Sequence, residues 1–158
     1  MLSRIAESLY WMSRYLERAD NTARLMEINL LYLVEAEEHL SEAVMWRPLL
    51  SISGSEAAFA QYYNATEITA QNVIQFMTKG PANPNAIHPS LRLARENARV
   101  VRDRISKEMW QGMNELWLTV DTRLKSSLPP ERAAASYAAV WSERAPVMSA
   151  CWSGRTVG

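Results

Sequence analysis

Residues 2–26, LSRIAESLYWMSRYLERADNTARLM, contain the pattern that decides the fold class. Apolar residues recur at the spacing of one face of an α-helix, at Ile5, Leu9, Met12, Leu16, Ala19 and Ala23, and later at Leu30. Ser3 is expected to cap this helix, which we predict to run to about Glu42. The apolar stripe predicts that this long helix packs one face against a core.

The next part of the chain predicts shorter helices and one clear break. Trp46, Pro48 and residues 51–55 indicate a turn, after which residues 56–63 and 66–78 are expected to form helices. Glycine, proline and asparagine then cluster between residues 79 and 89. Because these residues favour turns, we expect the chain to divide there into two helical halves.

A second apolar stripe follows the break, at Leu91, Ala94, Ala98, Val101, Ile105 and Met109. Pro89 suits the first turn of this helix, which we predict to extend, with a kink at Gly112, to about Lys125. A last, alanine-rich helix is expected from about residue 131 to 145. No long stretch alternates β-branched and polar residues. The sequence thus predicts one all-α domain over residues 1–158, an antiparallel helical bundle of about five to six helices.

Charge and composition argue against several classes of protein. Lys and Arg (17 together) balance Asp and Glu (17), so no overall field attracts nucleic acid or an anionic membrane. Charged residues interrupt the N-terminal segment, which therefore is no signal peptide, and no stretch is apolar enough to span a membrane. The single cysteine, Cys151, has no internal disulfide partner, as is typical of a reducing compartment. We expect a cytoplasmic protein without nucleic-acid or membrane partners.

Polar residues on two of the predicted helices form the candidate functional cluster. They adjoin the apolar stripes, at Arg14, Glu17, Arg18, Asn21 and Arg24 and at Arg95, Glu96, Asn97, Arg99 and Arg102. If the helices pack together, Glu17 can face an arginine across their interface. The leading interpretation is a set of interhelical ion pairs that fixes helix register. The alternative is a site for an acidic or phosphorylated ligand, because residues 92–107 hold six basic and two acidic side chains, a net charge of +4.

Other kinds of site find little support. Acidic residues and a histidine occur three or four positions apart at Glu35, Glu38, His39 and Glu42, but not in the Glu-x-x-His order of di-iron bundles. Neither a GxxxxGK[ST] loop nor a GxGxxG loop occurs. The two histidines, His39 and His88, lie far apart in the sequence, and nothing local indicates a serine or cysteine nucleophile with its base. We therefore predict no metal and no cofactor. Aromatic residues near the cluster are interpreted as core or subunit-interface residues: Tyr10, Trp11 and Tyr15.

Three segments together resemble a known family. Residues 2–26, residues 91–117 (LRLARENARVVRDRISKEMWQGMNELW) and residues 83–90 (NPNAIHPS) are similar to the alpha-E domain family, bacterial helical proteins named for a Glu-Arg motif. That motif is Glu17-Arg18 in this chain, and Ala86 and His88 depart slightly from the family's pattern. Family members commonly carry a second half with another Glu-Arg motif. The resemblance thus implies that this chain is a first half, either a natural half-domain or a truncated or frame-shifted product.

The resemblance also implies a function. Alpha-E domains are associated with ATP-grasp-type ligases and transglutaminase-like peptidases, in peptide-synthesis or peptide-modification systems. We therefore expect an accessory or scaffold domain that binds and does not catalyse a reaction. Its arginine-rich face is expected to dock such a protein or an acidic peptide. One alternative is an enzyme half in which Glu17 acts among the neighbouring arginines on an acidic or phosphorylated ligand. The other is a structural homodimer.

Overall fold

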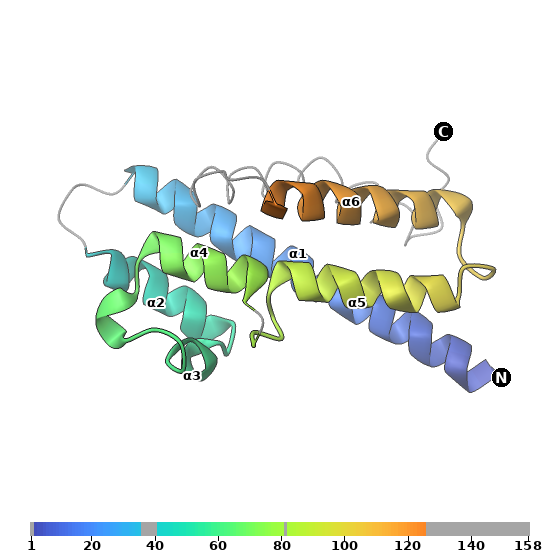
Figure 1. Ribbon diagram of the computed structural model, residues 1–158, viewed down its shortest axis with the longest axis horizontal. Helices are drawn as coiled ribbons and strands as arrows, with labels where there is room; N and C mark the ends of the chain where they lie inside the picture. Colours follow the sequence, from blue (N-terminus) through green and yellow to red (C-terminus); the bar gives the residue numbers. More distant parts are fainter. Residues whose placement is uncertain (1, 36–40, 81, 126–158) are drawn as a thin grey trace.

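The computed structural model describes residues 2–35, 41–80 and 82–125, which are mostly helical (Figure 1). The elements follow in the order α1 (Leu2–Glu35), α2 (Glu42–Ile52), α3 (Glu56–Phe59), the 3₁₀ helix η1 (Ala65–Glu67), α4 (Ala70–Lys79), α5 (Ile87–Val100) and α6 (Lys107–Lys125). No strand occurs among the described residues, and the predicted all-α fold is confirmed.

The longest helix, α1, organises the arrangement of the others. α1 makes its most extensive contacts with α5, and α5 packs in turn against α6. In Figure 1, α5 runs opposite to α1 and α6 runs back along α5. α2 contacts α1 as well, and α4 contacts both α2 and α5. The described helices therefore form the antiparallel bundle that the sequence predicts.

Within the described ranges, the core consists of two apolar clusters along α1. In the first, Met12 packs with residues of α5 and α6 that are at most 7% exposed: Ala94, Ala98, Met109 and Met113. In the second, the C-terminal half of α1 packs with large buried side chains of α2, α3 and α4, among them Trp46, Phe59, Phe76 and Met77. Small alanine side chains on α1 and α5 let these two helices approach closely.

The helix α2 occupies a stretch in which we predicted a turn. α1 is described as far as Glu35, the predicted end of the first helix at about Glu42 is the start of α2, and α2 includes Pro48. A proline inside a helix costs about 3 kcal/mol or more, whereas full burial of one large apolar side chain contributes roughly 1.5–3 kcal/mol. Three such side chains of α2 are at most 1% exposed: Trp46, Leu49 and Leu50. Their burial outweighs the cost of the proline, which is why the prediction was wrong for residues 46–52, whereas residues 53–55 form the predicted turn.

A turn separates α5 from α6, where the sequence predicted one continuous helix. The backbone N–H of Met109 donates a hydrogen bond of 3.1 Å to the Ser106 hydroxyl, so Ser106 caps α6. The reversal brings Met109 and Met113 back onto the interface of α1 with α5, where both are buried. The predicted apolar stripe is thus buried, but on two antiparallel helices. Helical spacing alone did not distinguish these arrangements.

The predicted break at residues 79–89 is confirmed. α4 ends at Lys79, α5 begins at Ile87, and Pro89 lies in the first turn of α5. The helix predicted at residues 56–63 is shorter and forms α3. The helix predicted at residues 66–78 is divided between η1 and α4.

The start of α1 differs from the prediction. Ser3 lies inside α1, which already begins at Leu2, so it does not cap this helix as predicted. The helix predicted at residues 131–145 lies outside the described residues. None of the helices within the described ranges combines the length and apolar character that crossing a membrane requires.

Candidate functional site

The loop between α4 and α5 is held by a buried asparagine. Asn83 is 1% exposed, and its Nδ2 donates to the Phe76 carbonyl at 3.3 Å. Its Oδ1 accepts hydrogen bonds from the Asn85 backbone N–H at 2.9 Å and from the Ser55 hydroxyl at 3.3 Å. Buried polar groups must be paired in this way, because an unsatisfied one is costly. Asn83 therefore fixes the loop against the end of α4 and the start of α3.

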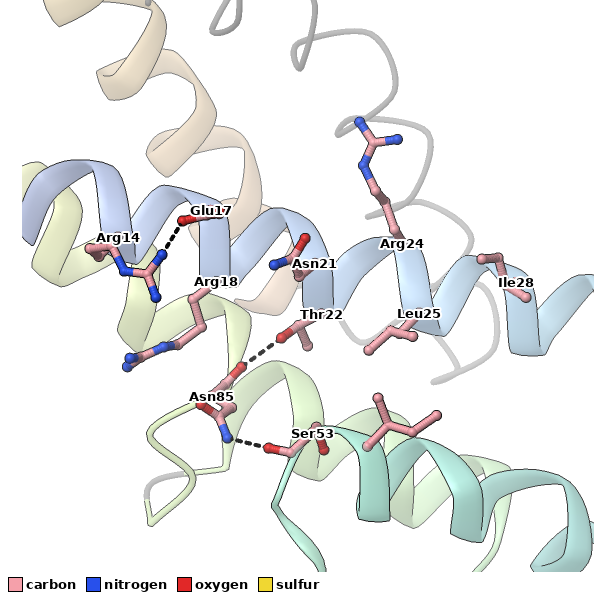
Figure 2. Close-up of a pocket in the computed structure, with 11 residues that line it drawn as sticks. Arg14, Glu17, Arg18, Asn21, Thr22, Arg24, Leu25, Ile28, Ser53 and Asn85 are labelled. Atoms are coloured by element: carbon pink, nitrogen blue, oxygen red, sulfur yellow. Dashed lines mark hydrogen bonds and ion pairs between the residues drawn. The ribbon is translucent and has the colours of Figure 1, made fainter.

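A second asparagine of this loop connects two helices. The Nδ2 of Asn85 donates to the Ser53 carbonyl at 2.7 Å, and the Asn85 carbonyl accepts a hydrogen bond of 3.0 Å from the Thr22 hydroxyl (Figure 2). Arg18 adds a bond of 3.4 Å from Nη1 to the Pro84 carbonyl. The loop thus lies between α1 and the turn that follows α2. These contacts position one side of a groove.

The groove runs along α1 and has a volume of about 550 Å³. Side chains of α1 form one wall and include both charged and apolar residues: Arg14, Glu17, Arg18, Asn21, Thr22, Arg24, Leu25 and Ile28. The opposite side is formed by Ile52, Ser53 and Asn85. Figure 2 shows Arg18 and Leu25 extending towards the side of Ser53, while Arg24 extends away from it.

The structure divides the predicted cluster into two groups. Five of its residues line the groove: Arg14, Glu17, Arg18, Asn21 and Arg24. The other five, on α5 and in the turn after it, do not line it: Arg95, Glu96, Asn97, Arg99 and Arg102. Helical spacing places each group on its own helix face, but it does not specify how the two faces are oriented in the bundle. The ten residues therefore do not line one common groove.

The residues of the second group have contacts of their own. Glu96 pairs with Arg92 at 2.9 Å, and the Nε of Arg95 donates to the Asn114 Oδ1 at 2.7 Å, which joins α5 to α6. The guanidinium of Arg102 lies 5.5 Å from the centre of the Trp110 ring, and the amide of Asn97 donates to the Leu93 carbonyl at 2.8 Å. Arg99 is exposed on α5.

Glu17 does not form the expected pair across the interface of α1 with α5. Its carboxylate accepts a bond of 2.6 Å from Arg14, one turn earlier on the same helix, and its side chain is 57% exposed. Arg24 likewise pairs within α1, with Asp20 at 2.9 Å. Exposed pairs of this kind contribute about 1 kcal/mol or less. Apolar packing and the asparagine loop, more than these ion pairs, hold the bundle together.

Arg18 differs from the other two arginines of the groove. Within the described ranges it has no carboxylate partner, and it bonds to the Pro84 carbonyl. Its guanidinium also lies 5.6 Å from the centre of the Tyr15 ring, a cation–π contact. Tyr15 stacks on Trp11 at 5.7 Å, and Trp11 meets Tyr10 edge-on at 5.3 Å. An aromatic row therefore leads along the surface of α1 to Arg18.

This aromatic row corrects part of the sequence interpretation. Tyr10 is 56% exposed and Trp11 39% exposed, so neither belongs to the core. Of the two predicted roles, core or subunit interface, the core is therefore wrong for these two residues. Tyr15 is half-buried and packs against the cluster around Met12. Adjacent positions on a helix lie about 100° apart, so these residues cannot all face the core that Met12 occupies.

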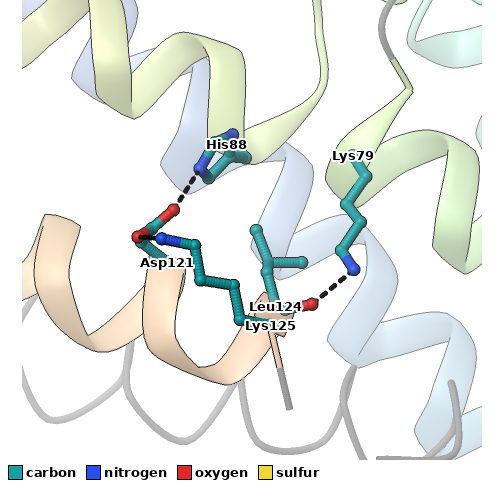
Figure 3. Close-up of polar contacts among 5 residues, drawn as sticks. All are labelled: Lys79, His88, Asp121, Leu124 and Lys125. Carbon is teal, nitrogen blue, oxygen red and sulfur yellow. Dashed lines mark hydrogen bonds and ion pairs between the residues drawn. The ribbon is translucent and has the colours of Figure 1, made fainter. Parts of the chain in front are cut away.

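A second polar cluster, which the sequence did not suggest, joins α5 to α6 (Figure 3). The Nε2 of His88 lies 3.1 Å from the Asp121 carboxylate, which also accepts a bond of 2.6 Å from Lys125. The bond from Lys125, and then that from His88, hold the pKa of the Asp121 carboxyl below its usual value. Lys79 donates to the Leu124 carbonyl near the end of α6, where a cation is favourable.

Metal-ligand side chains do not gather in the described part of the chain. Within these ranges no group of three or more histidine, cysteine or carboxylate side chains could hold a metal ion. His39, part of the candidate set with Glu35, Glu38 and Glu42, lies outside the described residues. His88 contacts Asp121 and stacks on Trp117, with ring centres 4.6 Å apart, and does not line the groove.

The fold and the groove together define a class of protein: an all-α bundle whose longest helix carries a groove with a Glu-Arg pair on its wall. The Alpha-E family, described as a predicted alpha-helical domain with a conserved ER motif, matches residues 1–146, and the chain belongs to this family. The pair that we expect to be this motif, Glu17-Arg18, lies in the groove. The family membership that the sequence indicated is thus confirmed.

Two similar proteins come from mycobacteria. The uncharacterized protein Mb2597 of Mycobacterium bovis is 27% identical over 156 residues, and the uncharacterized protein Rv2567 of Mycobacterium tuberculosis is 26% identical over 156 residues. Each match covers 92% of this chain and 17% of the relative, so the chain spans about a sixth of the length of these relatives. No solved structure matches the chain significantly.

Proposed function

We propose that this domain is a helical accessory or scaffold module that docks a protein partner in the groove along α1. The observation that carries the proposal is the groove itself, with a volume of about 550 Å³ and Arg18 on its wall without a carboxylate partner in the described ranges. By analogy with its family, the partner is an ATP-grasp-type ligase or a transglutaminase-like peptidase. The domain would then serve a peptide-synthesis or peptide-modification system.

Binding is supported because the charged side chains of the groove are not needed to hold the fold. Arg14, Glu17 and Arg24 form exposed pairs within one helix, and such pairs add little stability. The elements are fixed instead by buried apolar residues and by Asn83 and Asn85. Arginine is well suited to recognition, since its planar guanidinium can bind a carboxylate through two parallel hydrogen bonds.

A direct binding measurement tests this proposal. The ligase-like and peptidase-like proteins encoded in the source genome would be purified and titrated against the full chain by isothermal titration calorimetry. The wild type and Arg18→Ala would be compared, with Arg99→Ala as control because it removes the same charge outside the groove. We expect Arg18→Ala to weaken binding about tenfold, the loss typical of one charge-assisted hydrogen bond.

Two results would contradict the proposal. One is that neither candidate partner binds the wild-type chain. The other is that Arg18→Ala and Arg99→Ala bind equally well, because the contact would then lie outside the groove. Light scattering on the same samples tests the homodimer alternative: if two copies met through this groove, Arg18→Ala would lower the measured molecular mass.

A further inference from the structure

One stripe of α1 changes in chemistry along the groove. Its residues follow at three- or four-residue spacing and lie on one helix face: Arg14, Arg18, Asn21, Leu25 and Ile28. Ile52, at the end of α2, adds an apolar side chain from the other wall. Along α1, the groove therefore has a cationic end, an amide in the middle and an apolar end.

The cationic end offers a place for one anionic group. Arg14 and Arg24 each bond to a carboxylate on α1, so the charge of these pairs is already balanced. Arg18 bonds to a main-chain carbonyl through one Nη1 donor. A guanidinium has five N–H donors, and a bidentate carboxylate uses two of them. Arg18 can therefore keep its loop contact and bind one carboxylate.

The apolar end offers surface that a ligand could remove from water. Ile28 is 49% exposed and Ile52 72% exposed, although both line the same groove. Asn21 lies between this end and Arg18, and its side chain is exposed. An amide has both a donor and an acceptor, which match the carbonyl and N–H of a peptide backbone. This combination favours a peptide over a ligand that is charged along its whole length.

The spacing sets the length of the ligand. Arg18 and Ile28 are ten positions apart in α1, which is about 15 Å at the rise of an α-helix. An extended peptide advances about 3.3 Å per residue. We infer that the groove binds an extended peptide segment with a carboxylate at Arg18 and, roughly four to five residues away, an apolar side chain at Ile28 and Ile52. This inference rests on the proposed docking function and specifies its ligand.

Nucleic acid fits the same groove less well. A single strand carries one negative charge per nucleotide and needs a cationic track along its backbone. Only Arg18 among the groove arginines lacks a carboxylate partner within the described ranges, and the far end is apolar. The aromatic row at Tyr10 and Trp11 could stack bases, so a single-stranded oligonucleotide belongs in the test.

Selection from a random peptide library tests the inference without a known partner. The full chain would be immobilised and presented with phage-displayed random dodecapeptides, and the selected pools would be sequenced. From the wild type we expect enrichment of Asp or Glu at a spacing of roughly four to five residues from Leu, Ile, Val, Met or Phe. Arg18→Glu should replace the acidic preference with Lys or Arg, and Ile52→Asp should abolish the apolar preference.

The control variant is Arg99→Glu, which reverses a charge on α5 outside the groove and should leave the selected pattern unchanged. Thermal unfolding of each variant by circular dichroism would verify that it is folded. A synthetic peptide with the selected pattern should bind Arg18→Glu at least about tenfold more weakly than the wild type in fluorescence anisotropy. Selection of no pattern, a pattern unaffected by Arg18→Glu, or stronger binding of oligothymidylate than of the peptide would overturn the inference.

These outcomes are distinct from failure of the proposed function. If the peptide pattern appears but neither candidate protein binds, the partner class is wrong and the ligand chemistry stands. If a candidate protein binds through the groove but the library yields no acidic and apolar pattern, the docking function stands and this inference is wrong.

Discussion

The hydroxyl of Thr22 on α1 donates a hydrogen bond of 3.0 Å to the main-chain carbonyl of Asn85 in the loop between α4 and α5. The two residues are far apart in the sequence, and the bond fixes where the loop lies relative to the groove. Arg18, one turn before Thr22, reaches the carbonyl of the preceding residue, Pro84. The position of the proposed binding arginine therefore depends on the loop as well as on its helix.

Substitution of Asn83 tests the role of this loop in stability. Asn83→Ala would remove the partner of the Asn85 N–H and one of the partners of both the Ser55 hydroxyl and the Phe76 carbonyl, next to a side chain that is 1% exposed. Leaving buried groups unpaired costs about 1–3 kcal/mol. We expect the free energy of unfolding, measured in urea by circular dichroism, to fall by about 2 kcal/mol.

Asn21→Ala is the matched control, because Asn21 is an exposed asparagine of α1. Its effect should be within about 0.5 kcal/mol. Equal losses of stability for the two variants would show that burial of the Asn83 side chain does not stabilise the loop.

Tyr15 is expected to position Arg18. Tyr15→Leu keeps an apolar side chain against the cluster around Met12 but removes the ring beneath the guanidinium. Cation–π contacts at exposed sites contribute about 0.5–1 kcal/mol. We therefore expect affinity for the selected peptide to fall roughly two- to fivefold, with the unfolding free energy nearly unchanged. Fluorescence anisotropy measures the former and urea unfolding the latter.

Tyr10→Leu separates positioning from direct contact. Tyr10 belongs to the same aromatic row but meets Trp11, not Arg18. If Tyr15 acts through Arg18, only Tyr15→Leu should weaken binding. Equal weakening by both variants would mean that the row itself contacts the ligand.

The helical part of this fold could be predicted because its core follows the 3.6-residue period. Met12, Ala19 and Ala98 were placed on apolar stripes and are buried. The loop network could not be predicted, because the partners of Asn85 are Thr22 and Ser53, and spacing along the chain carries no information about contacts that distant. A turn was expected in the loop, but not its contacts.

Half of the residues of the predicted cluster line the groove. Residues of one helix face, such as Arg14 and Arg18, do line one groove, since helical period places them together. The predicted ion pair of Glu17 was wrong, because Glu17 bonds to Arg14 one turn away on α1 and not to an arginine of α5. Which face of α5 meets α1 depends on packing in three dimensions, which helical spacing does not specify.

The Asp121 cluster predicts a dependence of stability on pH. The pKa of the Asp121 carboxyl is lowered in the folded protein, first by Lys125 and then by His88. A lowered pKa means that the ionised carboxylate stabilises the fold above the unfolded pKa of about 3.9, and that this contribution disappears as pH falls through the folded pKa. Asp121→Asn should therefore be less stable than the wild type at about pH 5, with a difference that decreases as the pH falls below about 3.9.

Thermal unfolding over that acidic range measures the difference. Its size should be at most about 1 kcal/mol, as for partly exposed ion pairs. Asp103→Asn is the control, because the Asp103 side chain is 75% exposed and bonds to its neighbour Arg104. A difference for Asp121→Asn that does not decrease as the pH falls below the unfolded pKa of about 3.9 would contradict the lowered pKa.

Ser106 distinguishes the observed helix pair from the single helix that the sequence predicted. As the cap of α6, its hydroxyl accepts the Met109 N–H at 3.1 Å, and Ser106→Ala should lower the unfolding free energy by about 1 kcal/mol. In the interior of a continuous helix the same change would stabilise the protein by up to about 0.5 kcal/mol, because alanine has the higher helix propensity. Urea unfolding of Ser106→Ala thus gives opposite signs for the two arrangements, and a gain in stability would contradict the turn between α5 and α6.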